Sequence, residues 1–393
     1  MQKVSLLFAP GWPMANEGLP INPEILTWAR VRAGVSLDDA SAKFKRIGEW
    51  EGGKSLPTYP QLEQLSDTFK IPIAVFFFPS PPQVPKIEET FRTLPDSDLQ
   101  QLPKTIRMLL RKAKALQLNL IEMTDGRNPA PRIVTNNLSF TPSVAIAEMA
   151  ATVREYLGIS IEQQAAWPDA EAALKEWRNV FTNVGVFVFK DAFRDEDFCG
   201  FCLYEDNFPI IYVNNSSSKT RQIFTLFHEL AHLLFHTSGI DKFVDDYLEH
   251  LDGDAKRIEI LCNQFAALVI LPDETLAAEL RGQLPNRDLA ERLAAKYNVS
   301  RETIYRRFLD RRLITQREYE DAAGFWASQR NNRDTSGGNP YWTKLSYLGR
   351  DYVSLALKEY HQNRIDETKL AEYLDTKPKH LAVLEDYYVR GGS

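Results

Sequence analysis

The sequence predicts an α+β protein that is mostly α-helical, on three observations. Apolar residues recur with helical spacing over most of the chain, three short strand-like runs stand together at 185–190, 198–204 and 209–213, and turn-forming stretches separate the helical parts. A chain of 393 residues is long for one hydrophobic core. We therefore expect a helical N-terminal module, a central domain with a small sheet, and helical C-terminal modules.

Composition places the chain among ordinary globular proteins, with 44% hydrophobic and 25% charged residues. The net charge of −6 argues against a protein that coats nucleic acid. No apolar run approaches the ~20 residues of a membrane span, and the N-terminus is too short and too broken by proline for a signal peptide. Cys199, Cys202 and Cys262 cannot form a disulfide framework, and we interpret the first two as buried strand thiols. These features predict a cytoplasmic protein without a membrane partner.

Residues 1–80 form the predicted N-terminal module, with helices at 23–33, 36–43 and 60–69 and Ser36 as a helix cap. The order WARVRAGVSLDDAS, EWEGGKSLPTYPQLEQLS and IPIAVFFFP resembles the Xre-type helix-turn-helix. Fewer residues separate Ala40 from Trp50 than in that family, so the recognition helix is shortened by nearly a turn. From 21 to 80, seven Lys and Arg balance seven Asp and Glu. We expect weak DNA binding at best, with a protein-contacting role as the alternative.

A helical linker region is predicted at 81–136. It begins near the Pro-rich joint SPPQVP and contains a helix at 103–123 whose basic stripe either faces solvent or covers DNA.

The central domain is expected at 137–282. Its helices at 142–157 and 169–182 precede the three strand-like runs, and a turn at 205–208 predicts a hairpin.

The stretch 227–236, FHELAHLLFH, contains an H-E-x-x-H pattern on a predicted helix. Four residues advance ~400° on a helix, so His228 and His232 lie on one face and can bind one Zn²⁺. Glu229 is then placed to take a proton from a water molecule at the metal. The alternative is a buried helix with two hydrogen-bonded histidines.

Catalytic zinc usually takes a third protein ligand. His236 lies one helical turn beyond His232, too far along the predicted helix to reach the same ion. Glu259 and Asn263 stand at i and i+4 on a second predicted helix, 254–270, so Glu259 can be the ligand while Asn263 hydrogen bonds to a ligand histidine. Glu259 could instead lie on a solvated helix face. Rival ligands stand in the intervening loop: Asp245, Asp246, Glu249, His250, Asp252 and Asp254.

Together, HELAHLLFH and the later pattern E-x-x-C-N-x-F-A-A-L-x-x-L-P resemble the ImmA/IrrE family of zinc metallo-endopeptidases. That family normally has Ala where this chain has Cys262. The resemblance implies a zincin-like, gluzincin-like domain with one Zn²⁺ per chain. It also implies cleavage of a specific Xre-type repressor, which relieves transcriptional repression in a stress response, a mobile element or a toxin–antitoxin setting. The reaction needs a further donor for its oxyanion, and Tyr212 and His236 are the two candidates.

Residues 283–330 predict a second helical, helix-turn-helix-like region. From 296 to 317 it has seven Lys and Arg against two Asp and Glu. Its arginines either contact nucleic acid or a protein partner, or are solvated: Arg301, Arg306, Arg307, Arg311 and Arg312. The stretch NNRDTSGGNP is a linker, and 341–393 is a small helical module without a chemical motif.

Two classes of function follow from these features. The first is a zinc endopeptidase with a protein substrate. The second is a DNA-binding regulator or antitoxin-like protein whose metal site is structural or inactive. The intact Glu229 favours the first, because a structural metal site has no use for a general base.

Overall fold

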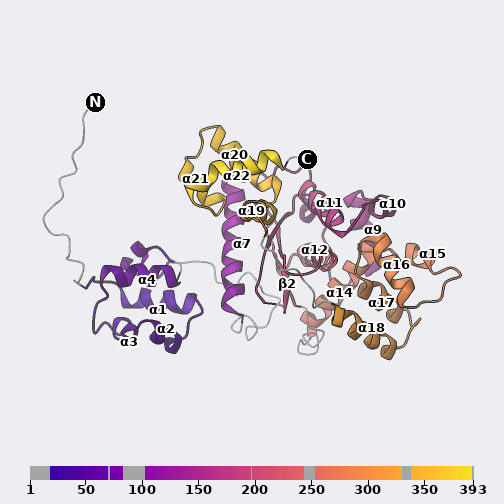
Figure 1. The fold of residues 1–393 in the computed structure, drawn as a ribbon, viewed down its shortest axis with the longest axis horizontal. Helices are drawn as coiled ribbons and strands as arrows, with labels where there is room; N and C mark the ends of the chain where they lie inside the picture. Colours follow the sequence, from indigo (N-terminus) through magenta and orange to yellow (C-terminus); the bar gives the residue numbers. More distant parts are fainter. Residues whose placement is uncertain are drawn as a thin grey trace. The chain divides into compact units, whose positions relative to one another are not determined.

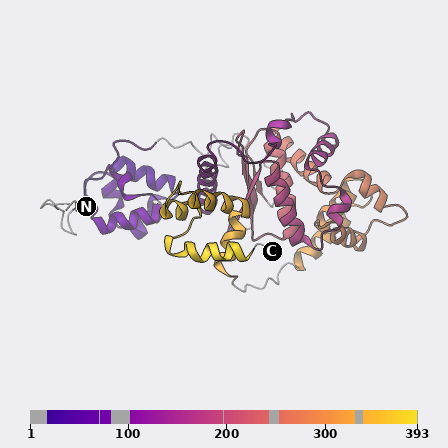
Figure 2. The ribbon, with the colours of Figure 1, turned by 90° about the horizontal axis from the view of Figure 1, so that it is seen from above.

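The computed structural model describes residues 18–69, 71–82, 102–195, 197–242, 253–329 and 338–391. The chain divides into two compact units, one of residues 1–86 and 100–109 and the other of residues 87–99 and 110–393. Figure 1 traces the chain through both units from indigo to yellow, and Figure 2 gives a second view. Each unit is described separately below.

The first unit is a bundle of short helices with a core of its own. Asn22 and Ser36 cap the first two helices with their side chains. Trp50 and Phe69 are buried in the core with Leu62. The helices are α1 (Pro23–Arg32), α2 (Leu37–Lys43), α3 (Ile47–Glu51), α4 (Tyr59–Phe69) and the 3-10 helix η1 (Ile73–Phe77).

The second unit contains a four-stranded mixed sheet in the order β1-β3-β2-β4. The strands are β1 (Phe187–Asp191), β2 (Phe198–Leu203), β3 (Ile210–Asn214) and β4 (Ile240–Lys242). β1 pairs with β3 in parallel, while β2 is antiparallel to β3 and β4. The α+β, mostly helical class is confirmed, as are the three strands and the hairpin. The prediction missed β4, because three residues after a helix give no detectable alternation.

Helices cover both faces of this sheet. Val188, Cys202 and Ile211 belong to the core cluster that includes the apolar side of α12 (Lys219–Leu234). On the other face, Phe189 packs edge-on against Tyr352 of α20 (Arg350–His361), with ring centroids 5.2 Å apart. Helix α7 (Lys104–Met123) also lies on that side, opposite α12 (Figure 1).

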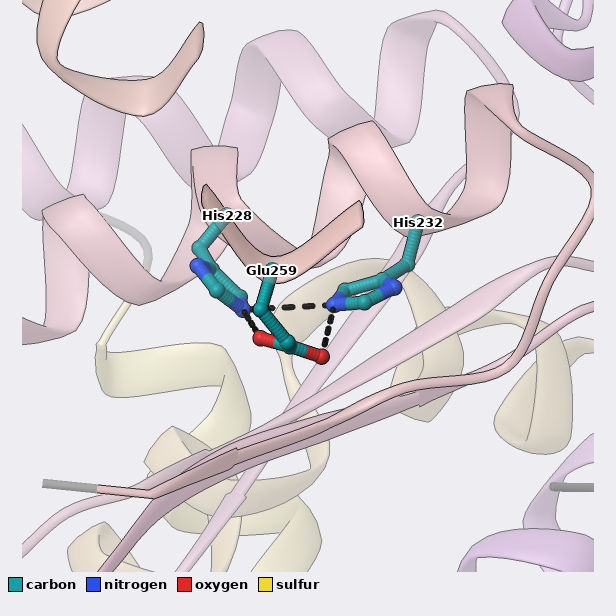
Figure 3. A group of neighbouring side chains, drawn as sticks. All are labelled: His228, His232 and Glu259. Atoms are coloured by element: carbon teal, nitrogen blue, oxygen red, sulfur yellow. Dashed lines mark hydrogen bonds and ion pairs between the residues drawn. The ribbon is translucent and has the colours of Figure 1, made fainter. Parts of the chain in front are cut away.

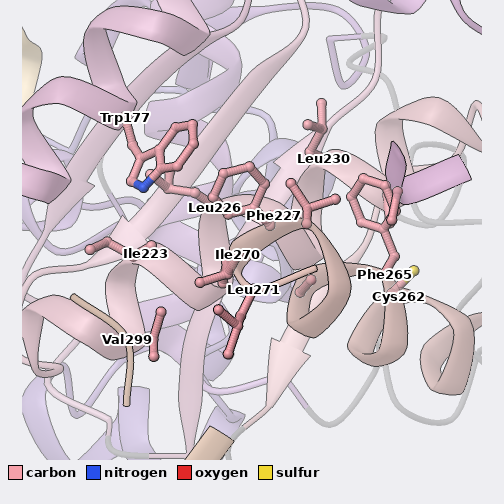
Figure 4. Packing of buried hydrophobic residues seen from close by; sticks show 14 of the residues in the cluster. Trp177, Ile223, Leu226, Phe227, Leu230, Cys262, Phe265, Ile270, Leu271 and Val299 are labelled. Carbon is pink, nitrogen blue, oxygen red and sulfur yellow. The ribbon is translucent and has the colours of Figure 1, made fainter. Parts of the chain in front are cut away.

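The core on the α12 side continues without a break into the helices that follow the sheet (Figure 4). Trp177, Phe227 and Phe265 lie in it together with Ile304 and Trp326. The helices of this part are α8 (Val134–Asn137), α9 (Ile146–Leu157), α10 (Ile161–Ala165), α11 (Ala170–Asn183), α12, α14 (Gly253–Ile270), α15 (Asp273–Glu279), α16 (Arg287–Tyr297), α17 (Arg301–Asp310) and α18 (Gln316–Ser328).

The last helices lie against the β1 side of the sheet, α19 at its edge and α20 on the face that carries Phe189. Arg178 of α11 donates hydrogen bonds to the carbonyls of Val188 in β1 and Ser346, which joins α19 to that edge. Lys112 of α7 forms ion pairs with Asp191 and Asp375. The elements are α19 (Pro340–Leu348), α20, α21 (Glu367–Tyr373), the 3-10 helix η3 (Pro378–His380) and α22 (Leu381–Arg390).

Within the described residues, no single helix is long and apolar enough to cross a membrane. One pair of helices, Lys256–Ile270 and Asp273–Glu279, passes that test by length and composition but is bent by 57°.

Candidate metal centre

Helix α12 carries two histidines into the core of the second unit. Ser218 begins the helix by accepting a hydrogen bond from the backbone N–H of Arg221, and no glycine or proline interrupts the helix. His228 and His232 are separated by one turn, so their rings lie on the same side, with centroids 5.0 Å apart. Both side chains are buried.

Helix α14 supplies the third polar group. Its apolar side, which includes Phe265, shares a core cluster with Phe227 of α12 (Figure 4). Glu259 and Asn263 are one turn apart on α14 and both reach the histidines of α12. Packing of the apolar sides of α12 and α14 therefore holds Glu259 and Asn263 opposite the two histidines.

Figure 3 shows the three side chains converging. His228 Nε2 lies 3.3 Å from His232 Nε2 and 3.3 Å from Glu259 Oε2, and His232 Nε2 lies 3.2 Å from Glu259 Oε1. Two ligands of a tetrahedral zinc ion with bonds of ~2.0 Å are about 3.3 Å apart. The spacing of these atoms therefore fits a tetrahedral ion. Among the described residues, these three form a group able to hold a metal ion.

The outward nitrogens of both imidazoles have partners of their own. His228 Nδ1 lies 3.1 Å from Asn263 Oδ1, an amide oxygen that can only accept. His232 Nδ1 lies 3.4 Å from Thr237 Oγ1, whose hydroxyl donates to the carbonyl of His232. Both Nδ1 atoms are thus assigned the ring proton, and both Nε2 atoms present lone pairs to the centre of the site.

This donor set fits a cation. Two imidazole lone pairs and a carboxylate face one another within 3.3 Å in a buried site, an arrangement that repels itself unless a positive charge lies between. Burial alone would raise the pKa of Glu259, but positive charge on the adjoining imidazoles outweighs burial and holds that pKa below its usual range. A positive charge at the centre of the site, whether a proton on an imidazole or a metal ion between neutral imidazoles, thus keeps the carboxylate ionised.

Glu229, on the histidine helix, is also buried. Its charge acts on the thiol of Cys202 on β2. Burial first, and then the negative charge of Glu229, raise the pKa of that thiol well above its ordinary value. Cys202 thus stays protonated beside the glutamate. The three cysteines form no disulfide, and Cys199 and Cys202 are buried on β2 as the sequence predicts, while Cys262 is buried on α14.

Tyr212 does not face the metal centre, which corrects one of the two predicted oxyanion donors. Its neighbours on β3, Ile211 and Val213, pack towards α12, so alternation along the strand turns Tyr212 to the opposite face. There its ring stacks on Phe201, and its hydroxyl donates to Asp191 at 3.3 Å.

His236 lies beyond the end of the helix, although the absence of glycine and proline predicts that the helix continues. Helix α12 stops at Leu234, and His236 adopts a left-handed backbone with φ 57°. Its exposed ring stacks on Tyr204, with centroids 5.0 Å apart. His236 does not join the group of His228, His232 and Glu259.

The arginines of α17 and the turn after it are mostly engaged within the chain. Arg307 is buried and donates to the carbonyls of Ala267 and Leu271 at the end of α14, as well as to Asp273. As a nucleic-acid or partner contact, Arg307 is therefore a wrong prediction, because basic composition does not show which helix face is buried. Three other arginines contact neighbouring side chains: Arg301 contacts Glu291 and Gln329, Arg306 contacts Asp310, and Arg311 contacts Asp273. Arg312 is exposed, and its backbone is left-handed with φ 56°.

The rival ligands in the loop before α14 lie outside what the structure describes. This holds for residues 245, 246, 249, 250 and 252 and for the side chain of Asp254.

The sequence analysis also missed two residues that contact His232, namely Thr237 and Gly239. A Cβ on Gly239 would lie 2.5–2.8 Å from ring atoms of His232, so only glycine lets the chain cross this imidazole. The glycine that follows the histidine helix could have been noticed in the sequence, but nothing in the sequence shows that it contacts His232.

Comparisons with known proteins agree with this geometry. Residues 182–309 match the family model of the IrrE N-terminal-like domain, a peptidase family. The match supports a metallopeptidase. The matched IrrE-like stretch contains all four strands, both helices of the metal centre and most of α17, so it extends further along the chain than the motifs from which the resemblance was inferred.

Two curated proteins, each described as the radiation response metalloprotease IrrE, are similar to part of the chain. The protein of Deinococcus radiodurans is 33% identical over 100 residues, and that of Deinococcus deserti is 36% identical over 100 residues. Each alignment covers 25% of this chain, and 30% and 34% of the respective relatives. The chain thus aligns with about a third of the length of either relative.

Proposed function

We propose that this protein is a zinc-dependent endopeptidase with one Zn²⁺ per chain, held by His228, His232 and Glu259. The observation that carries the proposal is the convergence of two imidazole lone pairs and an ionised carboxylate at 3.2–3.3 Å. The IrrE-like match over residues 182–309 supports a peptidase rather than a structural metal site. With a glutamate as third ligand, the site is of the gluzincin kind.

The reaction divides between the metal and Glu229. When bound, Zn²⁺ polarises a scissile carbonyl and makes an attacking water more acidic. Glu229 accepts the proton of that water and passes it to the leaving amine. His236 remains the candidate donor for the oxyanion, since its ring is exposed near the end of the metal helix.

The proposed substrate is a helix-turn-helix repressor of the Xre type, whose cleavage relieves repression in a stress response, a mobile element or a toxin–antitoxin setting. A zincin cleft holds a peptide largely through its backbone, which gives little selectivity. Selectivity must therefore come from surfaces outside the cleft. The first unit resembles such a repressor in its order of helices, which makes it a suitable surface for pairing with one.

The alternative is a DNA-binding regulator with an inactive metal site. Two observations weigh against it. Helix α3, at the position of a recognition helix, has five residues. In addition, Arg307 in the basic region is buried and used to join helices.

Co-expression tests the function directly. Wild type and Glu229→Gln are each expressed with the products of neighbouring genes, and a cleavage product seen only with the wild type is expected. Glu148→Gln, an exposed change on α9, is the matched control and should cleave as the wild type does. Cleavage of unfolded casein-like chains at the same rate with and without residues 1–80 would contradict the proposed docking.

Metal analysis tests the ligands separately. Protein purified without added zinc should contain one Zn²⁺ per chain, and Glu259→Gln should lose most of it. Unchanged stoichiometry and affinity in that variant would reject Glu259 as a ligand.

A further inference from the structure

Lys190, near the carboxyl end of β1, is a lysine with only 5% of its surface exposed. It pairs with Val213 of β3, and alternation along β1 places its side chain on the same face as Val188, the face that α12 covers. Among the described residues, its ammonium group takes part in no hydrogen bond or ion pair. A buried ammonium without an anionic partner is costly, and a negatively charged ligand would remove that cost.

The charged neighbours of Lys190 are mainly positive. Burial first, and then the positive charges of Arg178 on α11 and Lys219 on α12, lower the pKa of Lys190 to about 7, while the negative charge of Glu171 opposes them. Glu171 is mostly exposed, and its carboxylate lies 3.5 Å from Lys219 Nζ. Lys190 thus has two cations and one carboxylate around it, and that carboxylate is already paired with one of the cations.

Helix α12 begins at this cluster, because Lys219 is its first residue. Ser218 accepts from the backbone N–H of Arg221, and the N–H of Gln222 donates to the carbonyl of Ser218. The N–H groups of Lys219 and Thr220 therefore have no acceptor within the helix. Open N–H groups at the N-terminus of a helix favour the binding of an anion.

The first turn of α11 lies next to that of α12, since Glu171 of α11 pairs with Lys219. The N-terminus of α11 already has an anionic partner, because the carboxylate of Asp169 accepts from the N–H groups of Glu171 and Ala172. The cap of α12 is a neutral serine. Of these two neighbouring helix ends, α12 is therefore the one with donors left for a ligand.

We propose that Lys190, Lys219 and the N-terminus of α12 form a binding site for a phosphate group or a similar tetrahedral oxyanion. Such an anion has enough acceptor oxygens to meet the buried ammonium, the ammonium of Lys219 and the open N–H groups at once. The site is distinct from the metal centre. His228 stands nine residues after Lys219 on α12, about 13 Å along the helix axis.

Melting of the full chain tests the site without any cleavage assay. Millimolar inorganic phosphate, added at constant ionic strength, should raise the melting temperature of the wild type. Lys190→Met should melt higher than the wild type without phosphate, because it replaces an unpaired buried ammonium by an apolar chain of similar length. Phosphate should raise its melting temperature no further. Lys175→Met, which removes an exposed lysine from α11, is the matched control and should respond to phosphate as the wild type does. Equal shifts in the wild type and in Lys190→Met would mean an adventitious ion only and would overturn the proposal.

Titration followed by phosphorus NMR measures the affinity directly. Lys190→Met should weaken phosphate binding about 10–100-fold, the worth of a hydrogen bond to a charged group. Lys219→Met should weaken it less, because Lys219 is only partly buried. The same titration with a nucleoside monophosphate and with phosphoserine distinguishes the sources of the phosphate group. Tighter binding of either than of inorganic phosphate assigns the site to that class of ligand, and otherwise the ligand is free phosphate. Failure of the wild type to bind any of these, or wild-type affinity in Lys190→Met, would overturn the proposal.

Discussion

Helices α12 and α17 each carry several side chains suited to binding a ligand, and the two sets are used differently. On α12, the outward nitrogens of His228 and His232 have partners, while the inward nitrogens meet the carboxylate of Glu259. On α17, the guanidinium of Arg307 is directed to the end of α14 and to Asp273. The histidines of α12 leave inward lone pairs that only a cation can satisfy. The guanidinium of Arg307 on α17 has all its partners within the chain.

The comparison teaches that residue type alone does not identify a binding site. Arg307 and Arg154 donate to the carbonyls of Ala267 and Val269 in the last turn of α14, and the amide of Gln164 donates to the carbonyl of Ile270. Positive groups at the C-terminus of a helix oppose its dipole and satisfy its open carbonyls. The arginines therefore stabilise the helix that carries Glu259, and their role is structural.

The largest expected effect concerns the α12 set. Glu229→Gln should lower the rate of substrate cleavage by about 10²–10⁴-fold, the usual contribution of a general base. Zinc content and the melting temperature should match those of the wild type, because no ligand is removed. Single-turnover cleavage with metal analysis of the same samples measures both. A variant that cleaves at the wild-type rate would show that Glu229 is not the base.

The second prediction concerns the α17 set. Arg307→Met should lower the free energy of unfolding by about 3–5 kcal/mol, since it leaves the carbonyls of Ala267 and Leu271 without their donor and removes one of the two arginines that pair with Asp273. Denaturant unfolding followed by circular dichroism measures this change. Arg312→Met is the control and should change stability little, because Arg312 is exposed. Equal stability of the two variants would mean that Arg307 does not hold α14, and the contrast with α12 would fail.

The third prediction returns to the metal centre. Asn263→Ala should weaken zinc affinity by about 10–100-fold, the typical effect of removing the partner that orients a ligand histidine. Thr237→Val should have a smaller effect, because Thr237 lies 3.4 Å from His232 Nδ1 whereas Asn263 lies 3.1 Å from His228 Nδ1. Competition with a chelator of known affinity measures both. Wild-type affinity in Asn263→Ala would show that α14 orients His228 without this contact.

Spacing within a helix explains how much of the site could be predicted. The interval of four residues fixes the relation of His228 to His232 and of Glu259 to Asn263 whatever surrounds the helices. The strands and most helix bounds follow from apolar periodicity in the same way. These local rules do not depend on the tertiary fold, so the sequence contains them in full.

What the sequence could not predict depends on contacts between distant segments. The orientation of Tyr212 requires knowing which face of β3 packs on α12, and every residue of that strand is buried, so no polar alternation shows it. Gly239 lies against His232 just before β4, a strand of three residues that pairs with β2. Arg307 has a structural role because its helix packs against the end of α14. Each of these features can be predicted only when the packing of distant segments is known.

The smallest expected effect concerns the first unit, where we predict no tight, specific DNA binding. Helix α3 has five residues, about 7.5 Å of helix, and Ile47 and Trp50 of that helix are buried. Arg46, at its start, forms an ion pair with Glu49. Few side chains are left to reach base edges in a major groove, and the balanced charge of residues 21–80 gives little attraction to phosphates. Selection from random duplexes with the full-length chain at physiological salt should therefore enrich no sequence. Enrichment of one site with nanomolar affinity would show that the unit reads DNA, and would favour recruitment of the peptidase to an operator over pairing with a repressor.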